Sequence, residues 1–213
     1  MLLFPDLTDN RDFMEEEIFF DDDIAPLTVG DTVPAELDFP VYYNDDFGGM
    51  SFEELRGKWV ILMFYPRDFT FVCPTELGEM AALHAEFIEA GAEVVSVSTD
   101  TPEVHKAWHD VSPSIKDIKF PMAADPTHVL SELFGVLDED EGTARRATFI
   151  ISPEGEIVSM EMNHDSIGRS AKETMRKFKA AKFVGAHPAN VCPASWQEGE
   201  EVLTPGADMV GKI

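Results

Sequence analysis

Cysteine is scarce in this chain, because only Cys73 and Cys192 occur among its 213 residues. Two cysteines cannot build the disulfide framework of a small secreted domain, so each has to be a structural or a reactive residue. Long apolar runs are missing as well: no stretch reaches the roughly 18 residues that span a membrane. The start, MLLFPDLTDN, turns acidic where a secretory signal would be basic and then apolar. We therefore expect a soluble, cytoplasmic protein.

Basic residues are also few, with 16 lysines and arginines against 41 acidic residues and a net charge of −25. Nucleic acids and anionic membranes would repel such a chain, so we expect neither as a partner. The acidic residues are spread along the sequence, and two interpretations stay open. They form a solubilising surface, or they adapt the protein to a salty cytosol in which ions screen their mutual repulsion.

The first 26 residues hold nine of the acidic residues and a single base, with MEEEIFFDDD at their centre. High net charge of this kind is typical of segments that do not fold alone. We therefore predict a mobile, acidic N-terminal extension over residues 1–26. Its phenylalanines leave open that it docks elsewhere on the protein.

The rest of the chain alternates between strand and helix patterns. Continuous apolar runs predict buried strands at residues 59–65 and 93–98. We expect a third strand at 119–125, a hairpin over 147–162 around PEGE, and helices at 51–57, 74–90, from 101 onward, at 126–135 and at 170–184. This order favours an α/β fold whose sheet carries helices on both faces.

Helix boundaries are marked by local signals. Ser51 and Glu54 have the spacing of a capping box, and Thr101 followed by Pro102 is typical of a helix start. After Gly185 the sequence becomes rich in Pro, Gly and Ala. We therefore divide the chain after its extension into a domain at 27–185 and a C-terminal arm at 186–213, which holds Cys192.

Cys73 falls between a predicted buried strand and the start of a helix, in the stretch YPRDFTFVCPTEL. Free backbone N–H groups and the positive end of the helix dipole converge at such a position and favour a thiolate. A lone cysteine is often only a small buried apolar residue, so position alone leaves the two interpretations open. The residue three positions later is Glu76, which disfavours a C-x-x-C disulfide oxidoreductase.

Histidines offer two further alternatives. Six are present, and one of them would be needed as the base of a cysteine protease, yet nothing around Cys73 matches a local protease signature. His105 and His109 lie one helical turn apart, as metal ligands often do, but no third ligand accompanies them. We expect neither a metal ion nor a cofactor.

Several motifs in order carry a specific resemblance. PRDFTFVC spells P-x-x-x-T-x-x-C, and it is followed by HKAWH, RATFII, GRSAKETMRK and VCPASW. These resemble the typical 2-Cys peroxiredoxins of the bacterial alkyl hydroperoxide reductase C type, over roughly residues 30–213. The resemblance implies a thioredoxin-like fold with the added elements of peroxiredoxins and a mixed central sheet. The acidic extension has no recognised counterpart.

The resemblance also implies roles for individual residues. Cys73 matches the peroxidatic cysteine and Cys192 the resolving one. Pro66 and Thr70 match the shielding proline and the hydrogen-bonding threonine of the motif, and Arg146 matches the arginine that faces the thiolate. The carboxylate and arginine behind them correspond to Glu76 and Arg169. Without the motif, a surface salt bridge with Glu139 or Asp140 is the simpler interpretation of Arg146.

Activity and partners follow from the same resemblance. The implied enzyme reduces hydrogen peroxide and alkyl hydroperoxides to water and alcohols, through a sulfenic acid on Cys73 that then forms a disulfide with Cys192 of a second chain. This implies an antiparallel homodimer, often in a ring of five dimers (a decamer). The reductant stays open between a flavoprotein disulfide reductase and a thioredoxin-like protein. A ring-forming chaperone or peroxide sensor switched by the disulfide is the alternative function.

Overall fold

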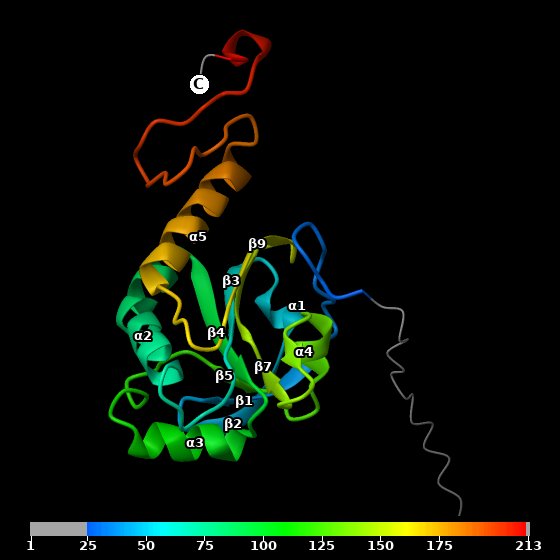
Figure 1. Cartoon of the computed structure of the whole chain (residues 1–213), viewed down its shortest axis with the longest axis vertical. Helices are drawn as coiled ribbons and strands as arrows, with labels where there is room; N and C mark the ends of the chain where they lie inside the picture. The colour runs from blue at the N-terminus through cyan, green and yellow to red at the C-terminus, as the bar shows by residue number, and fades with distance from the viewer. Residues whose placement is uncertain (1–24, 212–213) are drawn as a thin grey trace, which may run out of the picture.

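The structure is a computed structural model that describes residues 25–211. Residues 1–24, most of the predicted N-terminal extension, lie outside the described residues. The described chain folds around a seven-stranded sheet of order β2-β1-β5-β4-β3-β8-β9 (Figure 1). The strands are β1 Asp38–Tyr43, β2 Asp46–Ser51, β3 Trp59–Phe64, β4 Ala92–Ser98, β5 Met122–Ala124, β8 Arg146–Ile151 and β9 Ile157–Asn163, with β6 Leu137–Asp138 and β7 Thr143–Ala144 forming a separate pair. The helices are α1 Phe52–Leu55, α2 Cys73–Glu89, α3 Pro102–Val111, α4 Val129–Leu133 and α5 Ala171–Ala186, and a 3-10 turn covers Ala207–Met209.

The sheet is mixed, as expected. β3 pairs in parallel with β4, and β4 with β5, whereas β3 and β9 both run antiparallel to β8. The predicted hairpin is β8–β9, and its turn places Gly155 at a φ of 90°, which an L side chain rarely adopts. The predicted strands at 59–65, 93–98 and 119–125 correspond to β3, β4 and β5, and the last of these is shorter than expected.

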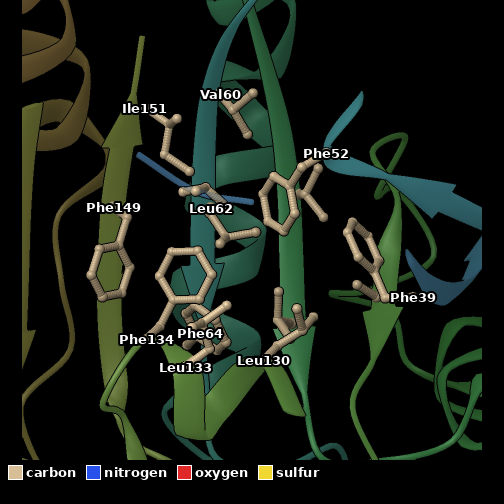
Figure 2. Packing of buried hydrophobic residues seen from close by; sticks show 14 of the residues in the cluster. Phe39, Phe52, Val60, Leu62, Phe64, Leu130, Leu133, Phe134, Phe149 and Ile151 are labelled. Atoms are coloured by element: carbon tan, nitrogen blue, oxygen red, sulfur yellow. The ribbon is translucent and has the colours of Figure 1, made fainter. Parts of the chain in front are cut away.

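Alternating side chains of β3 divide the core into two layers. Val60, Leu62 and Phe64 point to one face, where α1 and α4 add Phe52, Leu130 and Leu133 (Figure 2). Ile61 and Met63 point to the other face, where α2, α3 and α5 supply Leu77, Phe87, Trp108 and Phe178. A strand buried on both faces explains why the run WVILMF has no polar alternation. The expectation of helices on both faces is confirmed.

The β1–β2 hairpin was not predicted from the sequence. β1 alternates between exposed and buried residues, but β2, with the sequence DFGGMS, is largely exposed and carries no apolar pattern. Its turn has positive φ angles at Asn44 and Asp45, which suits a tight two-residue hairpin connection. The hairpin extends the sheet through β1, which pairs with β5.

Most predicted helix starts are confirmed. The Ser51–Glu54 capping box is present, with both reciprocal hydrogen bonds. Thr101 is the N-cap residue of α3, although its side chain makes no capping hydrogen bond to the backbone. The α5 helix begins after Ser170, whose hydroxyl accepts the N–H of Glu173 at 3.4 Å.

The C-terminal arm folds back on the end of α5 of its own chain. Trp196 is buried, its ring centroid lies 5.2 Å from that of Phe183, and its indole N–H donates to the carbonyl of Glu200. An isolated bridge between Val191 and Leu203 closes the arm into a loop. Figure 1 shows this arm beyond the C-terminal end of α5. Within residues 25–211, no helix has the length and apolar character needed to cross a membrane.

Candidate active site

Cys73 is the first residue of α2 and is buried. β3 ends at Phe64, so residues 65–72 form the loop that carries the chain from the sheet to this helix. The first turn of the helix holds Pro74, which has no N–H to leave unpaired, and the N–H groups of Thr75 and Glu76 both donate to the carbonyl of the N-cap residue Val72. The predicted position of the thiol at a strand-to-helix junction is therefore confirmed.

Arg146 lies directly against the thiol. Its Nη1 is 3.2 Å from Cys73 Sγ and donates to Glu76 Oε2 at 2.8 Å, while its Nε donates to the carbonyl of Asp165 at 2.7 Å. The side chain is buried at the start of β8. Burial alone would lower the pKa of Arg146, but Cys73 and Glu76 raise it above its ordinary value. The guanidinium therefore stays charged beside the sulfur.

The alternative salt bridge of Arg146 with Glu139 or Asp140 is not what the structure has. Its neighbour Arg145 faces solvent instead and pairs with Asp138 at 3.3 Å. Arg145 lies in the one-residue gap between β7 and β8, whereas Arg146 is the first residue of β8, whose residues are all buried. One of two consecutive arginines therefore reaches the thiol and the other does not.

Glu76 joins two arginines behind the thiol. Its Oε1 accepts the backbone N–H and the Nε of Arg169 at 2.7 and 2.8 Å, and its Oε2 accepts Nη2 of the same residue at 3.1 Å. Burial raises the pKa of Glu76, but the hydrogen bonds and charges of Arg169 and Arg146 outweigh it and bring this pKa below its ordinary value. The carboxylate is therefore ionised and fixes the orientation of both guanidinium groups.

Thr70 and Pro66 lie on the loop before the helix. The hydroxyl of Thr70 donates to the carbonyl of Arg67 at 3.0 Å, so its proton is engaged and its oxygen remains available as an acceptor. Pro66 is buried and offers no N–H. Phe69, between them, has a φ of 56°, an uncommon conformation for a bulky residue. Strain of this kind is often found at functional loops.

Cys192 is not part of this cluster within one chain. It lies on the C-terminal arm, half-buried, with its sulfur 4.0 Å from the carbonyl oxygen of Ala180. Burial raises the pKa of the Cys192 thiol, and the nearby Arg176 partly offsets this. The structure thus brings Cys73, Arg146, Glu76 and Arg169 together and leaves Cys192 near the opposite end of α5.

Two contributions to the site were missed from the sequence. The carbonyl of Asp165 orients Arg146, and a carbonyl contact leaves no trace in residue identity. A buried hydrogen-bonded chain also supports the loop: the Tyr65 hydroxyl donates to Asp68 at 2.7 Å, and His105 Nδ1 lies 2.8 Å from the other oxygen of Asp68. The second ring nitrogen of His105 lies 3.1 Å from the carbonyl of Ala123, so both nitrogens of this suggested ligand are engaged.

Comparison with known proteins identifies the family of this chain. The profile of the AhpC/TSA family matches residues 29–160, well over half of the chain. The chain belongs to the AhpC/TSA family. Alkyl hydroperoxide reductase C of Pseudomonas aeruginosa is 49% identical over 172 residues, which cover 81% of this chain and 92% of that protein. The protein of the same name from Escherichia coli is 48% identical, again covering 81% and 92%.

Solved structures of family members support the same assignment. The crystal structure of Enterococcus faecalis AhpC has a TM-score of 0.75 and 48% identity, and it covers 78% of this chain and 98% of its own. Reduced 2-Cys peroxiredoxin of Plasmodium vivax reaches a TM-score of 0.81 at 31% identity, covering 86% and 96%. The resemblance to AhpC-type peroxiredoxins and the thioredoxin-like fold are therefore confirmed, and this family member is a peroxiredoxin-type enzyme.

Proposed function

We propose that this protein is a thiol-dependent peroxidase that reduces hydrogen peroxide and alkyl hydroperoxides at Cys73. The observation that carries the proposal is the contact of 3.2 Å between Arg146 Nη1 and Cys73 Sγ, because it places a permanent cation against a buried thiol at a helix start. An inert structural cysteine has no need of such a partner. The names of the relatives, which include alkyl hydroperoxide reductase C, agree with this chemistry.

The first step transfers oxygen to sulfur. The Cys73 thiolate attacks the terminal oxygen of the hydroperoxide, so an S–O bond forms as the O–O bond breaks. The leaving alkoxide or hydroxide takes up a proton and departs as an alcohol or water, and Cys73 becomes a sulfenic acid. The oxygen of Thr70 accepts a hydrogen bond from the peroxide in this scheme, because its own proton is committed to Arg67.

Thiol acidity alone contributes little to the rate. At pH 7, lowering the pKa of a thiol from about 8.5 to about 6 raises its ionised fraction some 30-fold. The same change lowers intrinsic nucleophilicity by roughly tenfold, using the slope known for disulfide exchange. Most of the acceleration must therefore come from fixed donors that stabilise charge as it moves from sulfur to the leaving oxygen. Arg146 is the donor in contact with the sulfur.

The second step forms a disulfide between two chains. The sulfenic acid on Cys73 condenses with the Cys192 thiol, which forms an S–S bond and releases water. Two helical contacts support a second chain as the source of Cys192. At the start of α5 the Ala171 N–H donates to Glu79 of α2, and further along α5 the Lys182 ammonium donates to the carbonyl of Ala90, just after the end of α2. The two helices therefore run in the same direction.

This parallel arrangement separates the two cysteines of one chain. The Cys192 sulfur lies beside Ala180, and the rise from Ala171 to Ala180 along α5 is about 14 Å. Cys73 lies near the start of α5, at the Ala171 end of this distance of about 14 Å. The two Cα atoms joined by a disulfide lie within about 7 Å of each other, so the two cysteines of one chain are too far apart to pair. A homodimer is therefore part of the proposal, with a ring of five dimers as the larger assembly. A dithiol reductant, either a flavoprotein disulfide reductase or a thioredoxin-like protein, closes the cycle by reducing the disulfide.

Single-cysteine variants test this function. Cys73→Ser should abolish turnover of hydrogen peroxide with a dithiol reductant, because no nucleophile remains. Cys192→Ser should consume about one equivalent per chain and then stop at the sulfenic acid. A Cys73→Ser variant that keeps about a tenth or more of the wild-type turnover contradicts the proposal, since a loss of the nucleophile costs far more than tenfold.

A further inference from the structure

Two carboxylates of α2 hold the start of α5. Glu76 and Glu79 are three positions apart in the sequence and lie on the same face of the helix. Glu76 Oε1 accepts the backbone N–H of Arg169 at 2.7 Å, and Glu79 Oε2 accepts the backbone N–H of Ala171 at 2.9 Å. The two acceptors thus bind alternate N–H groups of one short segment, which fixes its position along α2. The two helices also pack against each other through Phe87 and Phe178, whose ring centroids lie 6.1 Å apart.

The segment before α5 fits closely against the same helix. A Cβ atom at Gly168 would lie 3.4 Å from Val72 and 3.7 Å from the side chain of Glu76, so this residue packs on the first turn of α2. Ala171 N–H is one of the first N–H groups of α5, which have no partner inside the helix. The Ser170 hydroxyl accepts a hydrogen bond from the N–H of Glu173 and not from that of Ala171. Glu79 therefore satisfies a donor that the N-cap residue does not.

The position of this segment determines where the arginines lie. Arg169 follows Gly168 directly, and it holds Glu76 through its Nε and Nη2 while its Nη1 donates to the carbonyl of Ala147. Glu76 in turn accepts Nη1 of Arg146, the nitrogen that faces Cys73. A chain of hydrogen bonds thus runs from Glu79 through the start of α5 to the thiol.

We propose that Glu79 is a positioning residue for the peroxidase reaction, which keeps Arg169, Glu76 and Arg146 in register with Cys73. Glu79 touches neither the thiol nor the substrate, and it acts only through the hydrogen bond to Ala171 N–H. The proposal rests on the proposed function, because its effect is on the rate at which Cys73 reacts with peroxide. The role requires a hydrogen-bond acceptor at this position, not a negative charge.

Glu79→Ala and Glu79→Gln separate these two properties in the full-length Cys192→Ser protein. The glutamine keeps an acceptor oxygen without the charge, whereas the alanine removes both. The matched control is Glu86→Ala, an exposed carboxylate on the same helix. For each variant, the rate of Cys73 oxidation by hydrogen peroxide is compared with the rate of Cys73 alkylation by iodoacetamide, which does not require the same alignment of Arg146 and oxygen.

Glu79→Ala should lower the peroxide rate by about tenfold and the alkylation rate by less than about twofold, because a misplacement of about 1 Å costs up to 10²-fold. In Glu79→Gln and Glu86→Ala, both the peroxide rate and the alkylation rate should stay within about twofold of those of the parent protein. If Glu79→Ala does not fold, Glu79→Asp, which withdraws the acceptor by one methylene, should show a smaller selective loss.

Three outcomes overturn the proposal. The first is an unchanged rate of Cys73 oxidation in Glu79→Ala, or in Glu79→Asp if that variant replaces it. The second is a Glu79→Gln variant that is oxidised as slowly as Glu79→Ala. The third is an equal loss of rate in oxidation and in alkylation. A Cys73 that fails to react with peroxide in the parent protein is a separate result, which contradicts the proposed function itself.

Discussion

Arg146 and Glu76 share one short hydrogen bond of 2.8 Å, and the nitrogen that makes it also lies 3.2 Å from the sulfur of Cys73. The carboxylate of Glu76 thus restricts the movement of the Arg146 guanidinium. The other terminal nitrogen of this group, Nη2, binds neither Glu76 nor Cys73. This geometry is suited to a reaction in which negative charge leaves sulfur and develops on oxygen, because the donors are in place before the charge moves.

Arg146→Lys tests whether this geometry matters. Lysine keeps the positive charge but loses the planar fork that meets the sulfur, Glu76 and the Asp165 carbonyl together. We expect the rate of peroxide reduction to fall by roughly 10²-fold or more, comparable to the loss of one oxyanion-type donor. Arg145→Lys, which changes a half-exposed neighbour, is the control. A variant of Arg146 within about threefold of wild type would make it a structural charge only.

Glu76→Gln tests the buried charge cluster through its pH dependence. The pKa of Glu76 lies below its ordinary value of 4.5 in the folded protein, so its contribution to stability is present above about pH 4.5 and is lost as the pH falls through the lower, folded value. At neutral pH the variant should be less stable by about 3 kcal/mol, because two buried arginines lose the negative charge that compensates them.

The same variant should approach the wild type in stability as the solution is acidified below about pH 4.5. Denaturant unfolding at both pH values measures the difference, with Glu86→Gln on the exposed side of α2 as the control. A stability difference that is the same at neutral and at acidic pH contradicts the assigned role of the ionised carboxylate.

The sequence predicted those parts of the fold that carry a local pattern. The Ser51–Glu54 box and the unbroken apolar run of β3 each depend on residues close together in the chain. The hairpin of β2 was missed because its residues are exposed and rich in glycine, so they show no periodicity. Only the turn residues Asn44 and Asp45 carried a usable signal.

The site was predicted by a different route. Position at a helix start suggested a reactive Cys73, but nothing local connects it with Arg146, which lies on β8, 73 residues further along the chain. That pairing followed from the family resemblance. The contribution of Glu79 was missed by both routes, because it depends on how closely α5 starts against α2.

Trp196→Ala tests how the C-terminal arm is held. Replacing a buried tryptophan removes about 3–5 kcal/mol of packing, which should release the arm locally. In a Cys73→Ser background, labelling of Cys192 by a thiol reagent should accelerate by about tenfold or more. Val210→Ala, at an exposed position of the same arm, is the control. Unchanged labelling would show that Trp196 does not keep Cys192 in place.

Salt should stabilise the protein because of its charge. Each chain carries −25, and the Debye length falls from about 30 Å at 0.01 M to about 3 Å at 1 M salt. We expect the melting temperature and the oligomer mass to rise between these concentrations, with sodium and potassium chloride acting alike. Deleting the N-terminal extension, residues 1–26, which removes nine acids and one base, should reduce this dependence without affecting turnover. A flat melting temperature would contradict adaptation to salt.

Non-reducing electrophoresis after one equivalent of peroxide tests the central claim most directly. Wild-type protein should migrate as a covalent dimer, and neither Cys73→Ser nor Cys192→Ser should do so alone. A mixture of the two variants, refolded together, should recover the dimer band, because each mixed pair holds one intact Cys73 and one intact Cys192 on different chains. Monomeric mobility of the oxidised wild type, or a dimer that persists in Cys73→Ser, would contradict the account.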